Sequence, residues 1–191
     1  MTIVEKENCK EGNKKMNIWH DINPDRITPE KFTAVVEIPK GNKNKYELDK
    51  ETGLLKLDRV LYTATHYPAN YGFIPRTYAD DNDPLDVLVL CEESILPLTL
   101  VECYPIGMLN MIDGDENDEK IIAIPIKEPT LSVYKDISEL PRHIFEQMKH
   151  FFEVYKVLEG KTTAIQEITG ADVAKACIEK CKNLYNEKFE K

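Results

Sequence analysis

The feature that most constrains the fold is a succession of short apolar segments, each ended by a turn, between residues 32 and 126. Their length and alternation are typical of β-strands rather than helices. The predicted strands are 32–39, 45–49, 54–62, 86–91, 99–111 and 120–126. We expect the longest to bend at Pro105 and Gly107, because both residues disturb a strand interior. A hairpin through the turn at 49–53 is expected to begin a meander.

Two helical patterns follow the strands. Apolar residues recur every three or four positions from Leu140 to Leu158, with Ser138 as the expected N-cap and Gly160 just past the end. A second helix is expected from about Ala171 to Tyr185, and its predicted buried face consists of Val173, Cys177, Cys181 and Leu184. Strands followed by helices indicate an α+β, mainly β fold. About five antiparallel strands suit a small closed barrel, which leaves no exposed edges, with the helices packed outside.

Length and composition indicate one folded domain. The chain has 191 residues, of which 42% are hydrophobic and 31% charged, enough to bury one core. Residues 1–16 are polar and lysine-rich, so we expect a loose N-terminal extension followed by a single domain over residues 17–191. No apolar run approaches the roughly 18 residues of a membrane span, and the first residues lack the apolar region of a signal peptide. A cytoplasmic protein without a membrane partner is therefore expected.

The cysteines do not suggest a covalent framework. Their number is odd, they contain no CxxC pair, and most of them lie in apolar segments. They are Cys9, Cys91, Cys103, Cys177 and Cys181. Buried reduced thiols are favoured over disulfides or a zinc site.

The net charge of −9 argues against a nucleic-acid partner. A polyphosphate backbone would be repelled by the overall field of the protein. A small anionic substrate could still bind wherever cations gather locally. Lys45, Arg59 and Lys156 are the candidate cations, although each alone is more often an ordinary surface charge.

The most informative group of charges is Asp81, Asp83 and Asp86, three carboxylates within six residues just before a predicted strand. Mutual repulsion makes such a cluster costly unless a cation lies within it. Mg²⁺ takes oxygen ligands and needs only one or two carboxylates per ion, so this cluster can serve more than one ion. A solvated acidic turn is the alternative interpretation. An EF-hand is disfavoured because Asp86 stands where its loop needs glycine.

A second acidic cluster lies in the turn between the last two strands. It consists of Asp113, Asp115, Glu116, Asp118 and Glu119. Taken alone, it is typical of a solvated hairpin tip. If both turns lie at the same mouth of the barrel, Asp113 and Asp118 would approach the first cluster and two or more metal ions could be held between them.

The chain carries, in this order, the motifs EIPKGNKNKYE, DR, HYPANYGFIP, DDNDPLDV, MIDGDENDEK and HFFEVYK. From about Asn17 to the last helix it resembles the family I soluble inorganic pyrophosphatases of bacterial type. The DxDPxD motif that begins at Asp81 is highly specific when it follows YPxNYGFIP. The resemblance implies an OB-like five-stranded antiparallel barrel with flanking helices, and hydrolysis of inorganic pyrophosphate to two orthophosphates.

The resemblance also implies roles for individual residues. The metal ligands would be Asp81, Asp86, Asp113, Asp118, Glu37 and Glu47. The catalytic residues would be Asp83, as general base, and Tyr71. The substrate would be bound by Lys45, Arg59, Tyr71, Tyr155, Lys156 and Lys120, with Tyr67 lining the pocket. The implied cofactor is Mg²⁺, several ions per subunit, with Mn²⁺ or Zn²⁺ as substitutes, and the implied assembly is a homohexamer.

A mechanism follows as a hypothesis. Asp81, Asp86 and Asp118 would hold two Mg²⁺ ions that lower the pKa of a shared water toward ~7, and Asp83 would accept its proton. One position departs from the family, whose members often carry an acidic residue where this chain has Gly114. Asp115 or Glu116 is a candidate to supply that charge to an outer metal.

Two other functions stay open. One is an OB-type binding module without catalysis, which the net charge and the aspartates of the main loop disfavour, because nucleic-acid binding needs a basic groove with stacking aromatics. The other is a metal-dependent hydrolase of nucleotides or longer polyphosphates, which would use the same metals.

Overall fold

The computed structural model describes residues 16–114 and 116–190. The expected extension at residues 1–16 therefore lies outside the described residues except for Met16, and so does Cys9.

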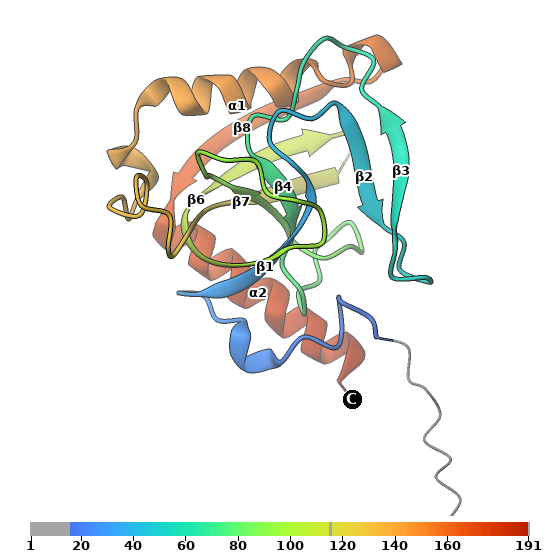
Figure 1. Ribbon diagram of the computed structural model, residues 1–191, viewed down its shortest axis with the longest axis vertical. Helices are drawn as coiled ribbons and strands as arrows, with labels where there is room; N and C mark the ends of the chain where they lie inside the picture. Colours follow the sequence, from blue (N-terminus) through green and yellow to red (C-terminus); the bar gives the residue numbers. More distant parts are fainter. Residues whose placement is uncertain (1–15, 115, 191) are drawn as a thin grey trace, which may run out of the picture.

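Five strands close into a barrel (Figure 1). The ring runs β1–β4–β5–β7–β6 and is closed by pairing of β6 with β1. The strands are β1 (Phe32–Ile38), β4 (Asn70–Phe73), β5 (Asp86–Val89), β6 (Leu100–Asp113) and β7 (Glu116–Pro125). This confirms the predicted α+β fold with an OB-like barrel. In β6 the register shifts between Pro105 and Gly107, where a bend was expected.

One strand pair departs from the antiparallel arrangement that the sequence suggested. β5 and β7 are parallel, with Asp86 opposite Lys120. A parallel pair needs a long crossover between its strands. Here β6 lies between them in the chain and supplies that crossover. The parallel pair matters for the site because it brings these two charged side chains into register.

The predicted hairpin is present, but the predicted meander is wrong. β2 (Asn44–Leu48) and β3 (Leu55–Val60) form a separate two-stranded sheet beside the barrel (Figure 1). β1 pairs with β4 and β6 instead of β2. Both edges of β1 are thus used within the barrel. All seven residues of β1 are buried, whereas the hairpin is mostly half-buried or exposed.

Two strands were not predicted. β4 lies within the segment 66–84, where no strand was predicted and where many Pro, Asn and Asp residues conceal its pattern. Gly72 makes this strand possible, because a Cβ there would lie 1.8 Å from the carbonyl oxygen of Val35 on β1. The other strand, β8 (Thr163–Gly170), pairs with β6 and has exposed polar residues that conceal its pattern.

The first helix is shorter than predicted. α1 runs over Arg142–Val154, with Pro141 at the N-cap instead of Ser138. Ser138 lies in a preceding turn of 3₁₀ helix that Asp136 caps. Gly160 does not end α1 but a later 3₁₀ turn, η3 (Val157–Glu159). The predicted pattern therefore merged three short elements into one.

The second helix, α2 (Ala171–Phe189), is longer than predicted, and two residues of its expected buried face are wrong, since Val173 is exposed and Leu184 only half-buried. Val173 is 47% exposed, because the buried stripe advances in steps of three or four from Ala171 and passes it by. The buried residues are Ala171, Ala174, Cys177, Ile178, Cys181 and Tyr185. The four described cysteines are free thiols, and three of them are buried, as expected.

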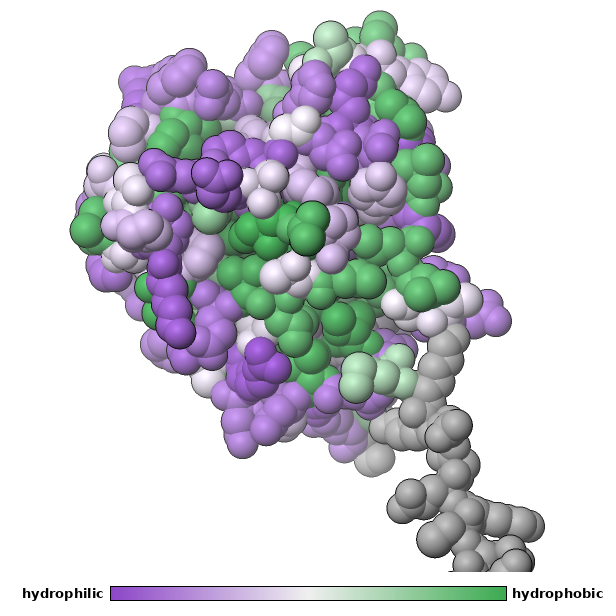
Figure 2. Space-filling view, viewed as in Figure 1, coloured by the Kyte–Doolittle hydropathy of each residue, from purple (hydrophilic) through white to green (hydrophobic). Residues whose placement is uncertain are grey.

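The core divides into two main clusters because neighbouring residues of a strand face opposite sides. Leu88 and Ile122 pack with residues of α1, whereas Val87 and Ile121 pack with residues of α2. Each helix thus covers a different face of the barrel wall. Polar side chains cover much of the outer surface, with an apolar area on the face in Figure 2. None of the described helices is long and apolar enough to cross a membrane.

Candidate active site

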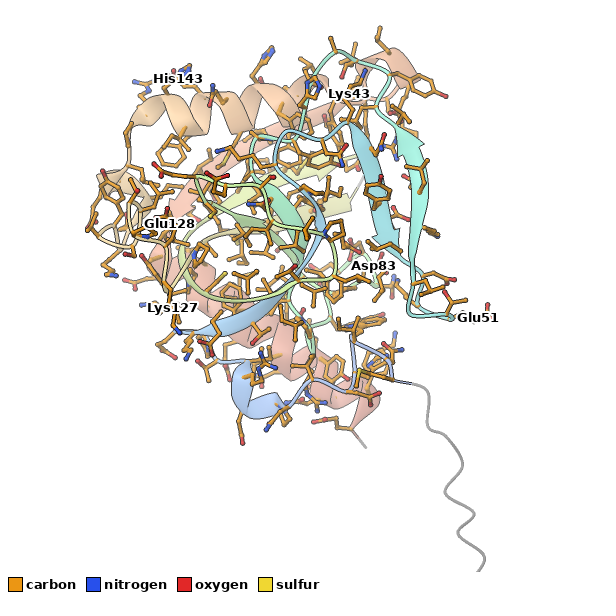
Figure 3. All side chains as sticks on the ribbon, in the orientation of Figure 1. Lys43, Glu51, Asp83, Lys127, Glu128 and His143 are labelled. Carbon is orange, nitrogen blue, oxygen red and sulfur yellow. The ribbon has the colours of Figure 1, made fainter. Side chains whose placement is uncertain are left out.

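A cavity of about 580 Å³ opens at the barrel mouth, between the β2–β3 hairpin, the acidic loop before β5 and the end of α1. It brings both acidic clusters together, as the sequence suggested. The predicted site residues that line it are Glu37, Lys45, Glu47, Tyr71, Asp81, Asp83, Asp86, Asp113, Asp118, Lys120, Tyr155 and Lys156. Figure 3 places the labelled Asp83 on the same side of the molecule as Glu51 of the hairpin turn.

Lys120 on β7 forms the centre of the site. Its side chain is 2% exposed, and its Nζ lies 2.7 Å from Asp86 Oδ2 and 2.6 Å from Asp118 Oδ1. Nζ also donates to the hydroxyl of Tyr71 at 3.1 Å. Burial alone would lower the pKa of Lys120, but Asp118 and Asp86 outweigh it, and the pKa is well above its ordinary value. Lys120 therefore stays positively charged.

Burial raises the pKa of three carboxylates of the site. Burial raises the pKa of Glu37 to about 8, although its Oε1 accepts the Leu48 N–H at 2.6 Å. Burial, with nearby Asp86 among other charges, raises the pKa of Asp81 to about 6. Burial also raises the pKa of Asp118, while Lys120 opposes the shift. Negative charge at this mouth is thus costly unless positive charge accompanies it.

The donor atoms suit a hard divalent cation. Carboxylate oxygens are the ligands that Mg²⁺ prefers, and a site with partly buried acids stabilises such an ion. As placed, no three acidic, histidine or cysteine side chains within residues 16–114 and 116–190 converge on one metal position. Between Asp86 and Asp118 the ammonium of Lys120 provides the positive charge instead. The residues therefore fit a metal by chemistry and by charge.

Two tyrosines supply hydroxyl groups. Tyr71 donates a hydrogen bond to Asp86, and Tyr155 lines the cavity at the end of α1. Burial raises the pKa of each phenol well above its ordinary value, so both remain protonated donors at neutral pH. Tyr67 is 2% exposed and does not line the cavity; its ring packs 5.4 Å from that of Tyr71 and 4.8 Å from that of Phe151. Tyr67 therefore contributes to the site only by packing against Tyr71.

The predicted basic residues divide into two groups. Lys45 lies beside Glu47 at 2.5 Å and Asp58 at 3.3 Å, and Lys156 pairs with Asp113. Both lysines line the cavity. Arg59, predicted to bind the substrate, does not. Its guanidinium pairs with Asp58 and, at 2.9 Å, with Glu159 after α1.

Several cavity residues were missed by the sequence interpretation. They are Trp19, Tyr46, Asp49, Lys50, Glu51 and Lys56, among others. The turn at 49–53 was interpreted only as a connection, although its Lys50 pairs with Asp83. No local pattern could have placed Trp19, because it reaches the mouth from a segment distant in sequence.

Gly114 has a structural explanation. It lies at the tip of the β6–β7 hairpin with φ of 68°, a conformation that favours glycine, and its missing Cβ would meet open space. An acidic residue there would be strained in this backbone. Asp115 and the side chain of Glu116, the other candidates for an outer metal, lie outside the described residues.

Comparisons with known proteins agree with this geometry. A family model described as inorganic pyrophosphatase matches residues 34–186. The chain is 44% identical over 171 residues to soluble inorganic pyrophosphatase 2 of Chlamydomonas reinhardtii, covering 90% of this chain and 89% of that protein. It is 48% identical over 167 residues to the soluble inorganic pyrophosphatase of Zea mays, covering 87% and 78%.

A solved structure shares the fold. The crystal structure of inorganic pyrophosphatase from Thermus thermophilus matches with a TM-score of 0.86 and 37% identity, covering 90% of this chain and 99% of that one. The chain belongs to the inorganic pyrophosphatase family.

Proposed function

We propose that this chain hydrolyses inorganic pyrophosphate to two orthophosphates with a water activated by Mg²⁺. The observation that carries the proposal is the cavity that Asp81 lines together with Asp86 and Asp118, the two carboxylates that pair with the buried Lys120. Membership of the inorganic pyrophosphatase family supports the substrate and a dependence on metal. The choice of Mg²⁺ rests on the oxygen donors alone.

The carboxylates would bind the metal cations that the reaction needs. Asp81, Asp86, Asp113 and Asp118, with Glu37 and Glu47, would ligate the metal. When bound, Mg²⁺ lowers the pKa of water toward ~7 and neutralises phosphate oxygens. Asp83 lines the same cavity and accepts the proton of the attacking water.

Lysine and tyrosine side chains would bind the phosphate groups. Lys45, Lys156 and Tyr155 line the cavity and can donate to oxygens that gain charge in the transition state. Each such donor contributes about 10²–10³ in rate in comparable sites. Lys120 and Tyr71 hold the carboxylate of Asp86 through their own hydrogen bonds. Arg59 can reach the substrate only after leaving Asp58 and Glu159, so we assign it a weaker role.

Other features from the resemblance remain proposals. We propose that residues 17–191 act as one catalytic domain, that the protein works in the cytoplasm, and that its subunits form a homohexamer. Light scattering after size exclusion tests the last of these. The described lining of the cavity does not favour a nucleic-acid partner, since it includes carboxylates from both acidic clusters.

The test is phosphate release from pyrophosphate with and without Mg²⁺, for the wild type and Asp83→Asn. Asp83→Asn preserves shape but removes the proton acceptor, so turnover should fall about 10²–10⁴-fold with folding intact. Asp80→Asn is the matched control, because Asp80 belongs to the same loop but pairs with Lys180 and does not line the cavity.

The outcomes separate the candidate functions. Turnover near wild type in Asp83→Asn rejects Asp83 as the base. Release from ATP or tripolyphosphate that is faster than from pyrophosphate favours the polyphosphate hydrolase. A wild-type protein that releases no phosphate with any divalent metal is a binding module.

A further inference from the structure

The turn of the β2–β3 hairpin reaches the acidic loop through Lys50. Its Nζ pairs with the carboxylate of Asp83 and lies 5.2 Å from the centre of the Trp19 ring. All three residues line the cavity. Figure 3 shows Asp83 beside the hairpin end that carries Glu51, the neighbour of Lys50. Lys50 is thus held between an aromatic face and the proposed proton acceptor.

Trp19 is a fixed platform for this lysine. Trp19 is 6% exposed, and its Nε1 donates to the carbonyl oxygen of Thr77 at 2.9 Å. The hydroxyl of Thr77 in turn accepts the N–H of Leu85 at 2.8 Å, within the acidic loop. The Trp19 ring also contacts Phe189 near the end of α2, 5.4 Å away. The indole is therefore anchored both to the base of the acidic loop and to a helix.

Asp83 itself has little else to hold its carboxylate. Its side chain is 53% exposed, in contrast to the 26% of Asp86, which two side chains hold. The hydrogen bond from the Asp83 N–H to Asp81 fixes the backbone but leaves the side chain to rotate. A general base must stay within hydrogen-bond reach of its proton. Lys50 supplies a contact that restricts this rotation.

We propose that Lys50, seated on Trp19, is a positioning residue that holds the Asp83 carboxylate in its productive orientation. The inference rests on the proposed role of Asp83 as proton acceptor. A positioning role predicts a lower kcat with little change in KM, since Lys50 acts through Asp83. A direct contact between Lys50 and the substrate would instead raise KM.

The first experiment compares Lys50→Met, Lys50→Arg and the wild type. Exposed ion pairs are weak, so kcat of Lys50→Met should fall about three- to tenfold, less than the ~10²-fold that misplacing a catalytic group can cost. Lys50→Arg restores the cation and should recover most of the rate. Lys127→Met is the matched control, because Figure 3 shows Lys127 on the side of the molecule away from Asp83.

A double-mutant cycle gives the decisive result. If Lys50 acts through Asp83, Lys50→Met should lower the residual rate of Asp83→Asn no further. An additional loss in the Asp83→Asn background, a raised KM, or an unchanged kcat in Lys50→Met overturns the proposal. A wild-type protein without pyrophosphate hydrolysis would instead overturn the proposed function, and the two failures are therefore distinguishable.

Fluorescence tests the contact without any turnover. Trp19 is the single tryptophan of the chain, so its emission reports on the mouth of the cavity. Lys50→Met removes the ammonium from the indole face and should alter this emission, whereas Lys127→Met should not. Identical spectra for Lys50→Met and the wild type contradict the contact on which the proposal depends.

Discussion

The same cavity holds two lysine–aspartate pairings in opposite surroundings. Lys120 is 2% exposed and serves both Asp86 and Asp118, whereas Lys50 is 45% exposed and serves Asp83 alone. The chemical groups are identical, but water screens only the outer pair. Buried charges depend on one another for stability, while exposed pairs contribute little. The difference assigns the inner group to holding charge and the outer pair to orienting Asp83, with little contribution to stability.

Lys120→Met should produce the largest change in stability. The substitution keeps the volume but leaves Asp86 and Asp118 without their cation, which typically costs about 3–5 kcal/mol in free energy of unfolding. Urea unfolding in the presence of EDTA measures it. Lys50→Met is the matched control and should stay within ~0.5 kcal/mol of the wild type. Equal losses in the two variants would show that burial does not separate the pairings.

Removing the metal should have the next largest effect. A ligand that binds only the folded state stabilises it by about 2.7 kcal/mol at a concentration of 100 times its Kd. We therefore expect Mg²⁺ to raise the Tm of the wild type above its value in EDTA, measured by calorimetry. Asp118→Asn should reduce this rise, because Asp118 is one of the proposed ligands, and Asp80→Asn should not. A full rise in Asp118→Asn would place the metal elsewhere.

The inner region was the easier one to predict from sequence. Its carboxylates belong to two dense acidic clusters next to predicted strands, and closure of a small barrel brings such turns to one mouth. Lys120 and Asp118 are two residues apart on one strand, so they share a face. The parallel pairing that places Asp86 opposite Lys120 was not predictable, because no local pattern distinguishes a parallel strand of four residues from an antiparallel one.

The outer region was largely missed for a physical reason. Lys50 lies in a turn whose sequence is explained by the hairpin alone, so nothing in it indicated a site residue. Trp19 reaches Lys50 only through tertiary packing. Arg59 shows the reverse error, because the resemblance assigns it to the substrate while its contacts lie with Asp58 and Glu159. β4 was missed as well, although Gly72 permits the close backbone approach of β1 on which this strand depends.

Outside the cavity, the charge of Asp136 is stabilised in a third way, by hydrogen bonds rather than by a lysine. Its Oδ2 accepts the N–H of Ala171, the first residue of α2, at 2.8 Å. Its Oδ1 accepts the N–H of Ser138 at 3.0 Å and its hydroxyl at 2.7 Å. One half-buried carboxylate thus joins two elements by the hydrogen bonds that the start of a helix needs.

Asp136→Ala should give the smallest effect, about 1 kcal/mol in free energy of unfolding, as for other lost caps. Hydrogen bonds from Ala171 and then Ser138 lower the pKa of Asp136 below its ordinary 3.8. The stabilisation is therefore present above that value and is lost as pH falls through the lowered pKa. Urea unfolding should show a difference between Asp136→Ala and the wild type at neutral pH that shrinks in acid. Asp172→Ala, which removes an exposed carboxylate of the same first turn, should lack this dependence; a difference that persists in acid would assign the stabilisation to packing instead.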